Sequence, residues 1–151
     1  MAFQERNTVA SLTVSSLLLA FFGPRITTML LNDAFLAENL FQLWLIVIVG
    51  MILGTIAVTI LANIVHGAVY MASTQQEPDS LEYEEDERDQ LIELKGTRVA
   101  YVVFSFGVFF AMLSFVINQS PLPMFALLIA SGLVAQMVGN VSRLFRYRAG
   151  A

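Results

Sequence analysis

The sequence predicts an all-α integral membrane protein: a bundle of four transmembrane helices with a cytoplasmic amphipathic helix before the third span. Of the 151 residues, 57% are hydrophobic and only 13% are charged, whereas a soluble domain carries about 25% charged residues. The apolar residues form runs that reach the roughly 20 residues needed to cross a bilayer. Nine of the twelve acidic residues lie in one segment, 77–93, so the negative charge belongs to a single region of the chain.

The first predicted span covers residues 8–30. An uncharged stretch runs from Asn7 to Pro24, and apolar residues resume after Arg25 and continue to Leu31. Proline inside a helix removes a backbone hydrogen bond, so we expect a bend near Gly23-Pro24.

The second predicted span covers residues 41–66. It lies in a run, 39–76, that carries no formal charge apart from a titratable group on His66 and is too long for one straight span. We therefore expect its last turns to emerge from the membrane and to lead into a cytoplasmic acidic segment over 73–98.

The third and fourth predicted spans cover residues 99–117 and 123–142. Between them, residues 118–123 combine two prolines with three polar residues, which predicts a turn. The whole chain, 1–151, is then a single membrane domain.

The distribution of lysine and arginine predicts that both termini are cytoplasmic, because cytoplasmic loops carry an excess of these residues. With the four predicted spans, only Arg25 falls on the outer side. The other seven basic residues fall on the side of the termini: Arg6, Arg88, Lys95, Arg98, Arg143, Arg146 and Arg148.

The acidic segment has two different faces when it is placed on a helix. Glu82, Asp86, Asp89 and Glu93 fall within an arc of about 60°. The opposite side is apolar and basic. Such a helix either lies on the membrane with its acidic residues in water or continues directly into the third span, with Gly96 as a weak point. The residues of the opposite side are Arg88, Leu91, Ile92, Lys95, Arg98 and Val99.

The acidic residues repel one another at spacings of four, three and four, which destabilises an isolated helix. This arrangement indicates a cationic partner; the alternatives are a solvated face and a bound divalent metal, although the spacing does not fit an EF-hand loop. We expect no metal. The candidate partner-binding residues are Glu82, Asp86, Glu87, Arg88, Asp89, Glu93, Lys95 and Arg98.

The same stretch resembles a known family. Asp86-Glu87-Arg88-Asp89, followed by Ile92, Lys95, Arg98 and Tyr101, is similar to a motif of small prokaryotic four-helix membrane proteins of unassigned function. The resemblance implies residence in a prokaryotic inner membrane. Members often lie beside helix-turn-helix regulators, which suggests a soluble cytoplasmic protein partner. The family supplies no catalytic residues.

Five polar residues within or near the spans form a second candidate site, because polar groups inside a membrane are functional candidates. Asn63, His66 and Tyr70 share one helix face, and Gln136 and Asn140 are four residues apart. We expect them to converge in the cytoplasmic half, either as hydrogen bonds between helices or as a pocket around His66 that senses protons or a ligand.

Small residues are expected to mark the seams where helices of the same chain approach closely. They occur at helical spacing in three spans. The positions are Gly50 and Gly54, Gly107 and Ala111, and Ser131, Ala135 and Gly139.

No catalytic motif is present: the chain has no phosphate-binding loop, no nucleophile elbow, no cysteine and one histidine. We expect no catalytic residues and no cofactor. The acidic segment disfavours nucleic acid as a partner, and Arg143, Arg146 and Arg148 are predicted to anchor the chain to lipid.

The sequence therefore predicts a non-enzymatic inner-membrane protein whose acidic juxtamembrane helix docks a cytoplasmic partner or senses the membrane surface, with a regulatory role as one form of this function. The alternative is a small ion or solute channel or transporter that uses the polar cluster around His66. The lipid bilayer is one predicted partner. A soluble cytoplasmic protein and a second copy of the chain are left open as further partners.

Overall fold

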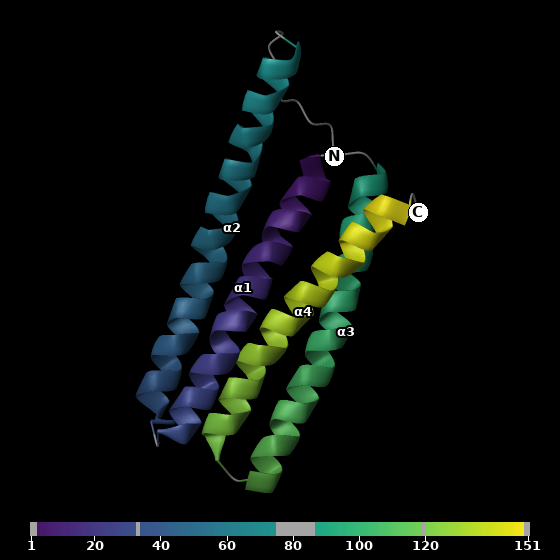
Figure 1. Ribbon diagram of the computed structural model, residues 1–151. Coiled ribbons are helices and arrows are strands. Elements are labelled where there is room, and N and C mark those ends of the chain that lie inside the picture. The colour runs from purple at the N-terminus through teal and green to yellow at the C-terminus, as the bar shows by residue number, and fades with distance from the viewer. Residues whose placement is uncertain (1–2, 33, 75–86, 119, 150–151) are drawn as a thin grey trace.

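The computed structural model describes residues 3–32, 34–74, 87–118 and 120–149, which form four helices (Figure 1). They are α1 (Phe3–Leu31), α2 (Ala37–Thr74), α3 (Glu87–Asn118) and α4 (Pro121–Ala149). Each is long and apolar enough to cross a membrane, which confirms the prediction of an all-α chain with four helices that could span a bilayer. Every helix extends beyond the predicted span, because helical hydrogen bonding does not end where the apolar run ends.

Helix α1 continues through Pro24. Thr27 Oγ1 donates to the carbonyl of Gly23 at 3.0 Å, and Thr28 Oγ1 donates to the carbonyl of Pro24 at 2.8 Å. In the turn that follows, Asn39 Nδ2 donates to the carbonyl of Ala34 at 2.8 Å. This bond ties the first turn of α2 to the end of the α1–α2 connection.

Helix α4 begins at Pro121, in the turn that the sequence predicts. Proline is favoured at the first position of a helix because its fixed φ suits the helix and its missing N–H would have no helical partner there.

The helices lie in the order α2, α1, α4, α3, as a row rather than a closed square (Figure 1). α3 packs along α4, α4 packs against α1, and α1 packs against α2. α2 touches α4 through a small contact, and within the described residues α2 and α3 share no extensive contact. The two edge helices therefore expose most of their apolar side chains, whereas α1 and α4 form the centre of the molecule.

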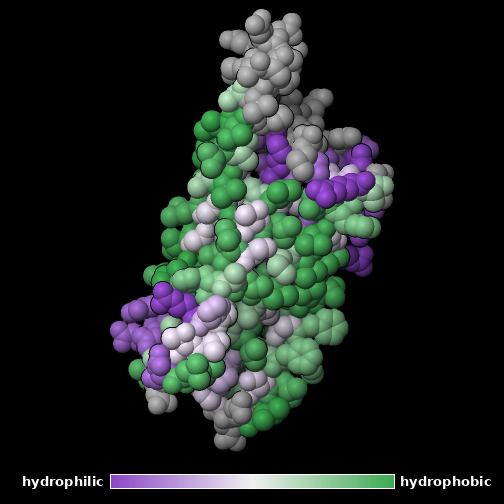
Figure 2. Space-filling view, in the orientation of Figure 1, coloured by the Kyte–Doolittle hydropathy of each residue, from purple (hydrophilic) through white to green (hydrophobic). Residues whose placement is uncertain are grey.

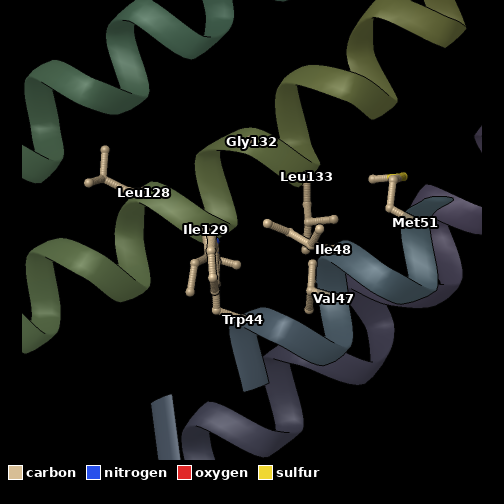
Figure 3. A pocket seen from close by; sticks show the side chains of 8 residues that line it. All are labelled: Trp44, Val47, Ile48, Met51, Leu128, Ile129, Gly132 and Leu133. Carbon is tan, nitrogen blue, oxygen red and sulfur yellow. The ribbon is translucent and has the colours of Figure 1, made fainter. Parts of the chain in front are cut away.

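The largest buried cluster lies near the α1–α2 turn and joins α1, α2 and α4. The rings of Trp44 on α2 and Phe125 on α4 are tilted by 49°, with centroids 6.2 Å apart. Beside this contact an apolar groove of about 210 Å³ lies between α2 and α4 (Figure 3). The buried members of the cluster are Phe22, Leu40, Leu43, Val47, Ala126, Ile129 and Leu133.

The predicted small-residue seams are confirmed as contacts within the chain. A Cβ placed on Gly54 would lie 3.1 Å from Val14 Cγ1 of α1. On the other side of the molecule, a Cβ on Gly139 of α4 would lie 2.9 Å from the Cβ of Ala100. The glycines thus allow α2 to approach α1, and α4 to approach α3, more closely than larger residues would.

The described part of the amphipathic stretch, 87–99, forms the first turns of α3, which is continuous from Glu87 to Asn118. Of the two arrangements that the sequence leaves open, the described residues adopt the one in which the stretch continues into the third span. Gly96 is not a break in this helix. Glu82 and Asp86 lie outside the described residues.

Hydrophilic residues gather near the two ends of the helices, and mostly hydrophobic surface lies between them (Figure 2). We call the end that holds the beginnings of α1 and α3 and the ends of α2 and α4 the charged end. The opposite end, with the α1–α2 and α3–α4 turns, is the loop end (Figure 1).

Candidate functional site at the charged end

Arg143 of α4 is the centre of a polar network at the charged end. Its side chain is only 14% exposed and lies against α3. Nη2 lies 2.7 Å from Glu93 Oε1 and donates to Thr97 Oγ1 at 2.8 Å. Nη1 donates to Asn140 Oδ1 at 2.8 Å, one helical turn earlier on α4. The guanidinium therefore binds two residues of α3 and one of its own helix.

Asn140 carries the network on to α1. Its side chain is 1% exposed, and Nδ2 donates to Ser11 Oγ at 2.9 Å. A continuous chain of polar contacts thus runs from Glu93 on α3 through Arg143 and Asn140 on α4 to Ser11 on α1. Buried polar groups are stable when they are hydrogen-bonded, so this network fixes the relative position of three helices.

Gly96 creates the space for Arg143. The residue is buried, and a Cβ at this position would overlap the aliphatic part of the Arg143 side chain. Glu93 and Thr97 are four residues apart and flank Gly96, so both present their oxygens to the same guanidinium. The glycine that the sequence indicated as a weak point in the helix is instead a packing position.

The structure corrects the prediction for Arg143, which was expected to anchor the chain to lipid. That prediction is wrong for this residue, because its side chain is largely buried and is held by Glu93, Thr97 and Asn140. Arg148 is more exposed, at 64%, and its Nε lies 3.6 Å from Glu5 Oε1. At 3.6 Å, and with the arginine largely in solvent, this pair contributes little to stability, although Glu5 is only 15% exposed.

The acidic face of the α3 stretch has a cationic partner within the chain, at least at Glu93. Asp89 is half-buried, and Ile92, expected on the opposite face, is only 2% exposed. Ile92 is buried because it belongs to the side of α3 that meets α4. That side continues at helical spacing through Gly96, Ala100 and Gly107. The line of small residues was the signal that could have identified this face from the sequence.

The outward face of α3 remains exposed. It holds the cationic Arg88, Lys95 and Arg98 and the apolar Leu91 and Leu94, the last two 54% and 70% exposed. Glu87 is also exposed. Within the described residues, Lys95 and Arg98 have no ion pair, in agreement with the lack of an acid at helical spacing.

Of the five polar residues of the second candidate site, the three whose side chains the structure describes, Asn63, Gln136 and Asn140, do not gather in one place. α1 lies between α2 and α4 at the charged end (Figure 1), so Asn63 is separated from Asn140. Asn63 Oδ1 is buried without a hydrogen-bond partner. Gln136 instead lines a groove of about 270 Å³ between α3 and α4, with Thr97 and Tyr101. The side chains of His66 and Tyr70 lie outside the described residues.

In the described ranges, no three histidine, aspartate or glutamate side chains come close enough to hold a metal ion. The chemistry of the charged end is therefore that of a hydrogen-bonded ion pair and an exposed helix face. Searches against protein-family models, curated proteins and solved structures found no match to this chain.

Proposed function

We propose that this chain is a non-enzymatic protein of a prokaryotic inner membrane, with both termini cytoplasmic, and that it docks a soluble cytoplasmic protein on the first turns of α3. The proposal keeps the partner expected from the sequence but moves the docking surface. The surface is the outward face of α3, defined by Arg88, Leu91, Leu94 and Lys95, rather than the acidic face, which includes Glu93.

The observation that carries the proposal is the length of α3 before its apolar span. Residues 87–98 extend the continuous helix by about 18 Å, whereas a headgroup layer is only about 5–8 Å thick on each side of the bilayer. Arg98 then lies within the headgroup layer, and Lys95 lies at its outer limit. Arg88, Leu91 and the first turn stand beyond it, where exposed leucines face water unless a partner covers them.

The Arg143–Glu93 contact supports this role by holding the base of the extension to α4. A helix that is fixed in direction presents its outward face without the loss of freedom that binding otherwise imposes. The alternation of cationic and apolar side chains on that face favours a partner surface that is acidic and apolar.

Affinity purification from native membranes tests the proposal. Leu91→Glu/Leu94→Glu should lose the partner that the wild type retains, because both apolar contacts are replaced by charge. The matched control is Gln90→Glu, which adds a negative charge to an exposed residue of the same turns but keeps both leucines. The same partner profile for the wild type and the double variant would refute docking on the outward face.

A spin label separates docking from sensing of the membrane surface. The chain has no cysteine, so Leu91→Cys carries the only label. In bilayers that contain anionic lipid but no partner, docking predicts a water-accessible label. A lipid-accessible label, lost in Lys95→Gln/Arg98→Gln, would instead favour a helix that senses the membrane surface.

A further inference from the structure

Arg25 is the one basic residue at the loop end; the other seven lysine and arginine residues lie at the charged end. It lies in α1, six residues before the helix ends at Leu31, or about 9 Å along the axis. Its guanidinium carbon is 5.2 Å from the centre of the Phe21 ring. Among the described residues, no carboxylate forms an ion pair with it.

A groove of about 250 Å³ between α1 and α2 includes Arg25 in its wall. Its apolar lining comes from Phe21 and Met29 of α1 and from Leu43 and Ile46 of α2. Phe21, Arg25 and Met29 are spaced by four residues and therefore lie along one face of α1. The guanidinium is thus set among apolar side chains rather than in a polar loop.

Two amide side chains of α2, Asn39 and Gln42, complete the lining. Asn39 is held at the rim by its bond to the carbonyl of Ala34, which leaves its second amide hydrogen for a ligand. Gln42 is exposed, and no hydrogen bond from its side chain is present in the described part of the chain. Both lie in the first turns of α2, where the helix dipole favours negative charge.

We propose that this groove binds one anionic membrane phospholipid, with the phosphate at Arg25, Asn39 and Gln42 and an acyl chain along Phe21, Met29, Leu43 and Ile46. The guanidinium fork matches the geometry of phosphate oxygens. Within the described residues its charge has no ion pair, although Glu38 lies in the first turn of α2, and this positive charge favours an anionic over a zwitterionic headgroup. The apolar lining selects a lipid over inorganic phosphate, which has no chain to fill it.

Native mass spectrometry of the full chain in neutral detergent, with added phosphatidylglycerol or phosphatidylcholine, tests the site. The wild type should retain phosphatidylglycerol in preference. Arg25→Gln should lower that preference about fivefold, the effect of one basic residue near an anionic lipid. The matched control, Arg88→Gln, removes an exposed arginine that stands beyond the headgroup layer, and it should leave the lipid preference unchanged.

Gln42→Leu, which keeps the charge but removes one amide, should cause a smaller loss than Arg25→Gln. Circular dichroism should show unchanged helix content in each variant, since both side chains are exposed. Unchanged preference in Arg25→Gln, or an equal fall in Arg88→Gln, would overturn the proposal. Displacement of the lipid by millimolar inorganic phosphate would show that the site selects phosphate alone. None of these results bears on the charged end, which lies at the other end of the helices.

Discussion

At the scale of single residues, the contact between Glu93 and Arg143 decides how the charged end is held together. Glu93→Gln keeps the shape of the side chain but removes the charge that faces the guanidinium at 2.7 Å. Because Glu93 is 57% exposed, solvent screens the pair, and we expect a loss of about 1 kcal/mol rather than the larger cost of a fully buried pair. Reversible unfolding of the protein in detergent micelles measures it.

A double-mutant cycle isolates the pair itself. Arg143→Gln should cost more than Glu93→Gln, because it also removes the donors to Thr97 and Asn140. The double variant should be more stable than the sum of the two losses implies. Glu87→Gln, at an exposed position on the same helix, should have almost no effect. Strict additivity of the two changes would mean that the charges do not interact.

At the scale of helices, the α3–α4 seam depends on glycine at position 107. A Cβ there would overlap the Cβ of Ser131, an atom that rotation of the serine side chain does not move. Gly107→Ala should therefore destabilise the protein by about 1–3 kcal/mol, the usual cost of overpacking. Thermal unfolding measures this loss.

Gly67→Ala is the control for that change, since a Cβ at Gly67 would meet no atom within 4 Å. In an open position alanine is the better helix former by up to about 1 kcal/mol, so the control should be neutral or stabilising. If both substitutions act alike, helix propensity rather than the seam determines the effect.

Apolar run length predicts the four helices well, but it does not predict their ends or their partners. Helix α3 starts at Glu87, before its apolar span, because the helix needs no lipid to continue. The orientation of α3 was harder to predict, since nearly every residue of a span is apolar and hydropathy does not distinguish the lipid face from the protein face. Arg143 is 50 positions from Glu93 along the chain, and nothing local to either residue indicates the pairing.

At the scale of the whole molecule, the open row is a consequence of which faces carry small residues. α1 and α4 each meet two neighbours, whereas α2 and α3 end the row. Cysteine pairs test this, because the natural chain contains none. Val14→Cys/Gly54→Cys should form a disulfide between α1 and α2. Ile52→Cys/Val102→Cys should not link α2 to α3 within a monomer, since a disulfide needs Cα atoms within about 7 Å. An efficient α2–α3 link would indicate a closed bundle.

The same arrangement leads to a prediction about orientation. Four helices that alternate in direction bring Phe3 and Ala149 to one end. Seven of the eight basic residues lie at that end, and the positive-inside rule assigns it to the cytoplasm. A fluorescent-protein fusion after Ala151 should therefore fluoresce, and a phosphatase inserted within 32–38 should be active outside. Fusions that report the same side at both positions would contradict the four-span topology. If the fusion after Ala151 reports the outside and the insertion within 32–38 reports the cytoplasm, the four-span topology would stand in the inverted orientation. The outward face of α3 would then lie outside, where no cytoplasmic partner could reach it.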